Sequence, residues 1–536
     1  MQFIQLKNIS FTYPDHYTPT LRDITLDLAD GEKIALIGRN GSGKSTLIRI
    51  IMRELLPSSG TITYPRAVPG IGYLAQDVMI TNDCTVRDYL LHSQPLFHQL
   101  AAEIAELSGL EVYSEAQGLE LAELWQKYYD TGAQDWEKAI DDMLIEIQLS
   151  HIADQSCKTL SGGESTRIQM AMLLINKPDI LILDEPTNHL DTEQLEWLEQ
   201  WISQYKGTVL YVSHDRIFID NTATKVIELQ NGNALIRSGN YQSFTRDKAE
   251  LNDHQMVQYK ERQRLVHRLQ EASQKRRSWA KSFQPETQAE GGGFVYESVT
   301  NAARTMTQQA KHIEQRIKML QTRYPVEKPR TEKPRKISFS QAPVSRKELI
   351  SCQGLCFSYG AVPLLNDIYF FAFTGDRIWL SGCNGSGKTT LLSLLAGELQ
   401  PGKGSISYGE RLRIGIYHQD LTQLPAERTV IGYLKQSNKD EVTIRNFMGC
   451  MGLTGDIAFA EIGVLSWGER AKLQISRLLL EEYNILLLDE PTNHMDIPTR
   501  EMLEKALSDY PGVLIFVSHD RAFIRNLATR EYNLDK

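Results

Sequence analysis

Two stretches of this 536-residue chain have the glycine pattern of a loop that binds phosphate groups. Each ends in Gly-Lys followed by Ser or Thr. Glycines let backbone N–H groups converge on a phosphate where side chains would clash, the lysine reaches the outer phosphates, and the hydroxyl ligates Mg²⁺. We expect two nucleotide-binding sets: Gly38, Arg39, Asn40, Gly41, Ser42, Gly43, Lys44, Ser45 and Thr46, and then Gly382, Cys383, Asn384, Gly385, Ser386, Gly387, Lys388, Thr389 and Thr390.

Each loop is followed, much later in the chain, by an apolar run that ends in Asp-Glu-Pro-Thr-Asn-His. Such a run predicts a buried strand with two carboxylates at its end. Asp184 and Asp489 would hold Mg²⁺ through water. Glu185 and Glu490 are the natural groups to polarise an attacking water. The sequence therefore predicts two sites that hydrolyse a nucleotide.

The two copies differ by one insertion. Gln76 and Gln419 are 343 residues apart, whereas Asp184 and Asp489 are 305 apart, so the first copy has 38 extra residues between Gln76 and Ser161. Apolar residues recur there at helical spacing. We therefore expect a helical arm at about residues 90–150.

The segment between the copies is basic. Residues 246–347 contain 22 Lys and Arg against 11 Asp and Glu, although the whole chain has a net charge of −9. A basic insert in an acidic protein points to a polyanionic partner, and a solvated helical spacer is the alternative.

This basic segment also has a helical period. A break at about residues 284–294 separates two stretches with apolar residues at steps of three and four, which predicts an antiparallel hairpin with a coiled-coil seam. The seam is expected at Leu265, Leu269, Ala272, Trp279 and Phe283 on the first helix, and at Val299, Ala303, Met306, Ala310, Ile313, Ile317 and Leu320 on the second.

Further motifs resemble those of ATP-binding cassette (ABC) proteins. Leu160-Ser161-Gly162-Gly163-Glu164 is similar to their signature motif, Gln76 and Gln419 to their Q-loop glutamines, and His214 and His519 to their switch histidines. Tyr13 and Tyr359 fit the aromatic that stacks on adenine, with a core tyrosine as the alternative. The resemblance implies ATP and Mg²⁺ as cofactors. It implies Glu185, Glu490, His214 and His519 as catalytic residues, and Ser45, Gln76, Asp184, Thr389, Gln419 and Asp489 as metal-site residues.

ABC cassettes pair head to tail, so the resemblance implies that each ATP lies between one phosphate loop and the other cassette's signature. Ser466 and Gly468 would complete the first site, and Ser161 and Gly163 the second. The second signature has Trp467 where the family has a glycine. We interpret this as a packing variant, with an inactive site as the alternative.

The fold class expected from these motifs is α/β, with two tandem ABC-type P-loop ATPase cassettes joined by an α-helical hairpin linker. The expected domains are residues 1–245, 246–347 and 348–536. No apolar run reaches the roughly 18 residues of a membrane span, and the first residues lack the layout of a signal peptide. We expect a cytoplasmic protein without a membrane partner.

Among ABC proteins the chain resembles the F subfamily, which comprises soluble translation factors that bind the ribosome. Three features carry this resemblance: Asn-His-Leu/Met-Asp after each Asp-Glu-Pro-Thr, the arm, and the basic hairpin. An ATPase subunit of a transporter is the alternative from another class. The run from Gly293 to Ala303 is similar to the second linker helix of antibiotic-resistance members, and a housekeeping translation factor is the alternative to that role.

The subfamily resemblance implies the partners. They are the 70S/50S ribosome at its E site, rRNA and P-site tRNA, bound by a monomer whose linker lies near the peptidyl-transferase centre. Phe283 and Phe294 flank the hairpin tip and would either stack on a base or clamp the hairpin end. The residues expected to neutralise RNA phosphates are Lys275, Arg276, Arg277, Lys281, Arg304 and Lys311.

Overall fold

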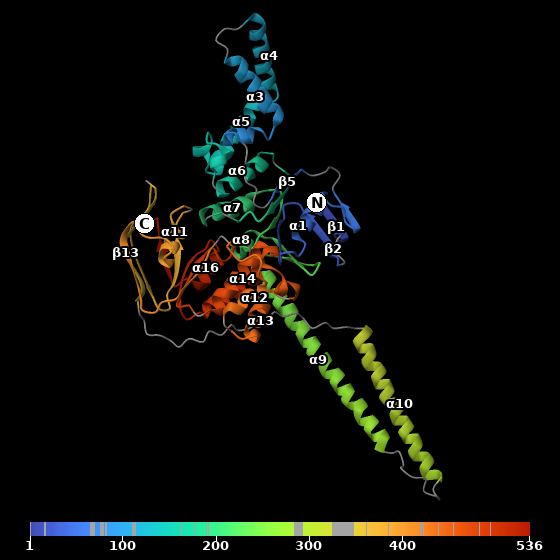
Figure 1. Cartoon of the computed structure of the whole chain (residues 1–536). Helices are drawn as coiled ribbons and strands as arrows, with labels where there is room; N and C mark the ends of the chain where they lie inside the picture. Colours follow the sequence, from blue (N-terminus) through green and yellow to red (C-terminus); the bar gives the residue numbers. More distant parts are fainter. Residues whose placement is uncertain are drawn as a thin grey trace. The chain divides into compact units, whose positions relative to one another are not determined.

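The computed structural model divides the chain into two compact units. One contains Met1–Tyr241 and Pro334–Lys536, and the other contains Gln242–Lys333. The two cassettes therefore belong to one unit and the hairpin forms the other (Figure 1).

The structure describes every residue except 1, 15–17, 65–69, 76–79, 81–82, 110–113, 161, 177, 189, 191, 283–292, 324–347, 361, 384, 419–420, 422, 438, 454, 482, 494 and 536. Side chains of residues 2, 3, 162, 293–300, 321, 323 and 362 also lie outside the description.

The first cassette is built on two sheets. The smaller is antiparallel with the order β2-β1-β4, and the larger has the order β5-β6-β7-β3-β8-β9, parallel except for its last pair. The strands are β1 (Gln2–Phe11), β2 (Leu21–Ala29), β3 (Lys33–Gly38), β4 (Ser59–Thr63), β5 (Ile71–Leu74), β6 (Ile180–Asp184), β7 (Thr208–Val212), β8 (Lys225–Gln230) and β9 (Asn233–Ser238).

The second cassette repeats this plan with a five-stranded parallel sheet, β14-β15-β16-β12-β17, and an antiparallel sheet, β11-β10-β13. Its strands are β10 (Glu348–Tyr359), β11 (Val362–Phe373), β12 (Arg377–Ser381), β13 (Lys403–Tyr408), β14 (Ile414–Tyr417), β15 (Ile485–Asp489), β16 (Val513–Val517) and β17 (Arg530–Asn533). The α/β class predicted from the motifs is confirmed.

The central strands of both parallel sheets are continuous apolar runs. β6 (ILILD) and β15 (ILLLD) are buried at every position, as are β7 and β16 beside them. A strand covered on both faces by helices loses its polar alternation, which is why these runs read as uniformly hydrophobic. Because β6 and β15 end in Asp184 and Asp489, the buried strands determine where these two carboxylates lie relative to the core.

Helices surround the sheets. Those of the first cassette are α1 (Lys44–Ile51), α2 (Val86–Leu91), α3 (Pro95–Ser108), α4 (Glu115–Asp130), α5 (Ala133–Glu146), α6 (Gly162–Ile175), α7 (Thr192–Gln204) and α8 (Arg216–Thr222). Those of the second are α11 (Lys388–Ala396), α12 (Val430–Leu434), α13 (Glu441–Cys450), α14 (Trp467–Leu480), α15 (Ile497–Ser508) and α16 (Arg521–Leu527).

Helices α3, α4 and α5 form the arm predicted at about residues 90–150 (Figure 1). Leu100, Ile104, Tyr128 and Ala133 make a small core of their own. None of the helices in the described ranges is both long and apolar enough to span a bilayer.

The hairpin consists of α9 (Tyr241–Ser282) and α10 (Gly293–Arg323). Arg262, midway along α9, donates to the Leu320 carbonyl near the end of α10. Farther along α9, Ser273 and Arg277 contact Glu314, at 3.0 and 2.8 Å. The two helices are therefore antiparallel, as the sequence predicts.

The seam of the hairpin agrees with the prediction on one helix only. On α10, Ala310 and Ile317 are buried, as the heptad pattern predicts. On α9 the prediction is wrong for Leu265 and Trp279, which are 41% and 59% exposed, whereas Leu269 and Ala272 are partly buried. The buried positions there are Ser273 and Ala280, because α9 turns its small residues, not its largest apolar ones, toward α10.

This difference gives a direct test of the seam. Replacing Ala280 with Glu places a charge between the two helices, so local opening of the hairpin should become easier by about 2 kcal/mol. Trp279→Glu introduces the same side chain on the exposed side of the same helical turn. Hydrogen exchange of α9 and α10 should therefore accelerate in the first variant and not in the second. If exchange accelerated in Trp279→Glu and not in Ala280→Glu, Trp279 would lie in the seam and the heptad prediction would be correct.

Candidate active sites in two nucleotide cavities

Each phosphate loop joins a strand to the start of a helix. β3 leads into α1, and β12 leads into α11. Gly43 and Gly387 cap these helices with φ of 99° and 95°, which side chains rarely adopt. A Cβ on Gly43 would lie 2.8 Å from Cδ2 of Leu21. The loop therefore needs glycine here, and the N-terminus of the helix that follows it favours an anion.

The lysines of both loops fold back over the backbone. Nζ of Lys44 donates to the carbonyls of Gly38 and Arg39, at 2.8 and 3.2 Å. Nζ of Lys388 donates to Gly382 and Cys383, at 2.7 and 2.8 Å. Burial lowers the pKa of both lysines, although carboxylates that include Glu185 and Glu490 oppose this.

Buried serine hydroxyls give a further indication that these loops take an anion. Oγ of Ser42 and Oγ of Ser386 are buried and have no hydrogen-bond partner among the described residues. A buried hydroxyl without a partner is costly, and a phosphate oxygen would satisfy it. Both cassettes therefore fit the phosphates of ATP.

A glutamate follows each buried strand in an unusual backbone conformation. Glu185 and Glu490 have φ of 52° and 49°, a left-handed region that is unfavourable for residues other than glycine. Their N–H groups bond to the carbonyls of Val212 and Val517, each at 3.0 Å. The neighbouring strand thus holds each glutamate in a strained turn.

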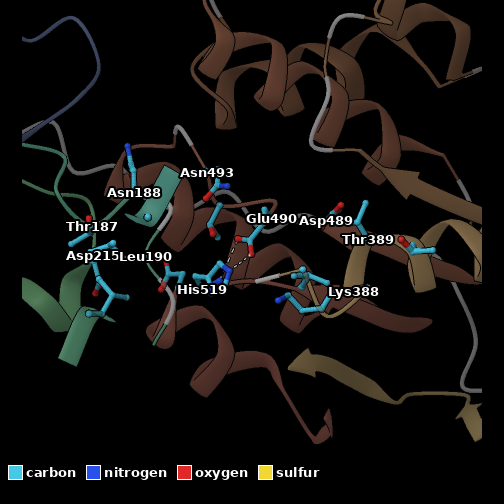
Figure 2. A pocket seen from close by; sticks show the side chains of 18 of the residues that line it. Thr187, Asn188, Leu190, Asp215, Lys388, Thr389, Asp489, Glu490, Asn493 and His519 are labelled. Carbon is cyan, nitrogen blue, oxygen red and sulfur yellow. Dashed lines mark hydrogen bonds and ion pairs between the residues drawn. The ribbon is translucent and has the colours of Figure 1, made fainter. Parts of the chain in front are cut away.

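Each glutamate faces a histidine. Nε2 of His214 lies 3.2 Å from Oε1 of Glu185, and Nε2 of His519 lies 3.3 Å from Oε1 of Glu490 (Figure 2). The His214 side chain is 8% exposed and that of His519 is 27% exposed. The two dyads share a geometry but differ in their access to water.

Burial also shifts the proton affinities of these groups. It raises the pKa of Glu185 to about 7, with Lys44 and Arg500 opposing the rise. It raises the pKa of Glu490 to about 8, with Asp489 adding to the rise. The pKa of His214 is held well below its usual value by burial and then by Lys44 and Arg500, so the histidine is neutral where it faces Glu185.

The first cavity, of about 610 Å³, combines both cassettes. Ser466, Trp467 and Gly468 of the second cassette line it together with residues of the first. The residues of the first cassette that line it and were predicted from the sequence are Tyr13, Asn40, Gly41, Gly43, Lys44, Ser45, Thr46, Asp184, Glu185 and His214. The structure thus brings together the signature and the phosphate loop that the head-to-tail arrangement implies.

The second cavity, of about 510 Å³, has the reciprocal composition (Figure 2). Gly163 of the first cassette lines it together with predicted residues of the second, namely Gly385, Gly387, Lys388, Thr389, Thr390, Asp489, Glu490 and His519. The Tyr359 side chain is 60% exposed and packs edge-on against Phe357, as Tyr13 packs edge-on against Phe11. The hydroxyl of Tyr13 bonds to Thr46 at 3.0 Å beside the first loop. The role of both tyrosines as the aromatic that stacks on adenine stays a prediction.

Four predicted residues lie outside the described part of the chain: Gln76, Ser161, Asn384 and Gln419. Within the described part, no three His, Cys, Asp or Glu side chains form a metal cluster. Ser45 with Asp184, and Thr389 with Asp489, offer one hydroxyl and one carboxylate in each cavity. This sparse oxygen set suits Mg²⁺, which takes its remaining ligands from water and phosphate.

The sequence analysis missed the ion pairs that join the cassettes. Arg216 pairs with Glu504, and Arg521 pairs with Glu199. Both members of one pair are 305 residues from their counterparts in the other, the same offset that relates Asp184 to Asp489. This shared offset of 305 residues could have indicated the pairs, because it makes the two arginines equivalent across the repeat and the two glutamates likewise.

These features define the class of protein: a P-loop ATPase whose two ABC-type cassettes each complete the other's nucleotide site. A sequence profile described as ABC transporter matches residues 21–188 and 365–493. The chain is 35% identical over 532 residues to the ATP-binding protein YdiF of Bacillus subtilis, covering 96% of this chain and 77% of that protein. It belongs to the ATP-binding cassette family and, within it, to the F subfamily.

Two other relatives place this result in context. ABC transporter F family member 2 of Arabidopsis thaliana is 28% identical over 543 residues, covering 98% of this chain and 76% of that protein. A structure of the archaeal ribosome recycling factor aABCE1, in complex with the ribosomal stalk protein aP1, matches with a TM-score of 0.59 and 18% identity, covering 98% of this chain and 87% of that one. At that identity the likeness shows a shared fold.

The different environments of the two glutamates predict different pH profiles. We propose that Glu185 and Glu490 polarise the attacking water, and a base of this kind works only when ionised, so kcat/KM falls as the pH drops through its pKa. Glu490→Gln leaves the first site working, and its acid limb should have a midpoint near pH 7. Glu185→Gln leaves the second, with a midpoint near pH 8.

The measurement is kcat/KM for ATP hydrolysis at saturating Mg²⁺ from pH 6 to 9, with nucleotide affinity followed over the same range as the control. Equal midpoints, or a higher midpoint for the first site, would contradict the assignment.

Proposed function

We propose that this F-subfamily ATPase binds the ribosome at its E site and uses ATP binding and hydrolysis to place the hairpin near the peptidyl-transferase centre, protecting the ribosome from antibiotics that target the 50S subunit. The protein acts in the cytoplasm as a monomer, because its two cassettes already complete both cavities within one chain. Its partners are rRNA and P-site tRNA.

The observation that carries this proposal is the shape and charge of the hairpin. α9 has 42 residues and would extend roughly 60 Å at 1.5 Å per residue. Lys275, Lys281, Arg304 and Lys311 are exposed on its two helices. A long rod with free cations suits a channel lined by RNA phosphates.

The contacts of the hairpin divide the predicted cations into two groups. Arg277 is paired with Glu314 at 2.8 Å, and Arg276 is half-buried. Arg277 therefore supports the helix pair, and Lys275, Lys281, Arg304 and Lys311 are the exposed residues we assign to neutralise phosphates. Phe283 and the side chain of Phe294, both predicted at the tip, lie outside the described part of the chain.

The relatives are consistent with a role in translation. The structural neighbour aABCE1 is named a ribosome recycling factor and was solved with a ribosomal stalk protein. A housekeeping translation factor with the same ribosome contacts is the second candidate, and membership of the F subfamily supports it equally. Drug susceptibility separates the two.

Ribosome binding is tested by trapping the closed protein. In the Glu185→Gln/Glu490→Gln variant, ATP binds without turnover, so in excess ATP the protein should remain with ribosomes on sedimentation. Adding Lys275→Ala, Lys281→Ala, Arg304→Ala and Lys311→Ala removes four phosphate contacts, which should weaken binding and lower its salt slope by about 3.

The control removes four exposed lysines elsewhere: Lys7, Lys206, Lys403 and Lys505. It carries the same change in net charge, so equal losses in the two variants would show that overall charge, and not the hairpin, drives binding. A protein that pellets with membranes instead would favour the transporter alternative.

Protection is tested by drug susceptibility of a sensitive bacterium with and without the gene, across the 50S-targeting classes. The intact protein should raise the inhibitory concentration of at least one class. A variant shortened at residues 284–294 should lose that effect and keep its ATPase activity. Unchanged susceptibility to every class, with ribosome binding intact, would favour the housekeeping factor.

A further inference from the structure

Arg500 lies between the two nucleotide cavities. It stands in the first turn of α15, is 8% exposed, and lines the first and the second cavity alike. Among the described residues that line the two cavities, Asn188 is the other one that lines both.

The guanidinium of Arg500 holds three partners in two cassettes. Nε donates to the carbonyl of Met495 at 2.9 Å. Nη1 donates to Oδ2 of Asp520, the residue after His519, at 3.0 Å, and also to the carbonyl of His214 at 3.2 Å. One side chain of the second cassette therefore joins the histidine loop of the first site to the histidine loop of the second.

The first cassette has no equivalent arginine. The position 305 residues before Arg500 is Leu195, a buried residue that lines the second cavity. By contrast, the Arg216–Glu504 and Arg521–Glu199 pairs occur in both directions. The contact that Arg500 makes with the other cassette thus occurs in one direction, whereas the arginine–glutamate pairs occur in both.

We propose that Arg500 is a positioning residue that couples the two ATP sites, fixing the His214 loop of the first site from the second cassette while it holds the Asp520–His519 loop of the second. A rearrangement at either histidine is transmitted to the other through one rigid, planar group. The proposal rests on the ATPase activity of the chain and is independent of ribosome binding.

The test compares Arg500→Leu, which reproduces the residue of the first cassette, with Arg500→Lys, which keeps the charge but lacks the planar fork. A Glu490→Gln background reports on the first site and a Glu185→Gln background on the second. In each background both Arg500 variants should lower kcat for ATP hydrolysis severalfold and change KM little, because each site loses the group that holds its histidine loop. A fall in one background only, or full activity of Arg500→Lys, would overturn the proposal.

A second readout needs no turnover. Both Arg500 variants lose the bond to the His214 carbonyl, so hydrogen exchange over residues 212–216 should accelerate in otherwise intact protein without nucleotide. The matched control, Arg216→Leu, breaks a reciprocal pair and should weaken nucleotide binding at both sites to the same degree. If Arg500→Leu does not fold, Arg500→Lys decides: unchanged exchange at residues 212–216 would refute the coupling role.

Discussion

Two arginine–glutamate pairs hold the cassettes against each other, and both nucleotide cavities depend on them. The side chains of Arg216 and Glu504, and of Arg521 and Glu199, are largely shielded from water. Ion pairs of this kind stabilise an interface only when their geometry is good, because desolvation of each charge opposes their attraction. Loss of one partner leaves the other charge buried alone. The interface is therefore strong when it is aligned and poor when it is not.

The two sites that this interface creates are similar in plan and unequal in chemistry. Burial keeps His214 neutral, whereas His519 is more exposed to water. Trp467 stands in the signature that faces the first site, and glycine stands at the matching position facing the second. Arg500 adds a cation beside the first glutamate. Together these differences lead us to expect that the two ATP molecules are hydrolysed at different rates.

Much of this architecture was predictable from the sequence. The α/β class, the arm and the hairpin follow from local motifs and periodicity, which a few adjacent residues determine. The pairing of each phosphate loop with the other cassette's signature was implied by the resemblance to ABC proteins. The seam of α9 was not predictable in this way. A heptad pattern predicts that the large apolar residues are buried in the seam, whereas α9 buries Ser273 and Ala280 and leaves Trp279 exposed. Arg500 was missed for a different reason: it stands in an ordinary amphipathic helix, and its role depends on partners about 290 and 20 residues away.

Helix α15 carries one more contact of consequence. Beside Arg500, Glu501 accepts a hydrogen bond at 3.4 Å from the hydroxyl of Tyr241, the first residue of α9. Helix α15 of the second cassette thus lines both nucleotide cavities through Arg500 and contacts the first residue of α9 through Glu501. A single substitution in this helix can therefore affect both sites and the start of α9 at once.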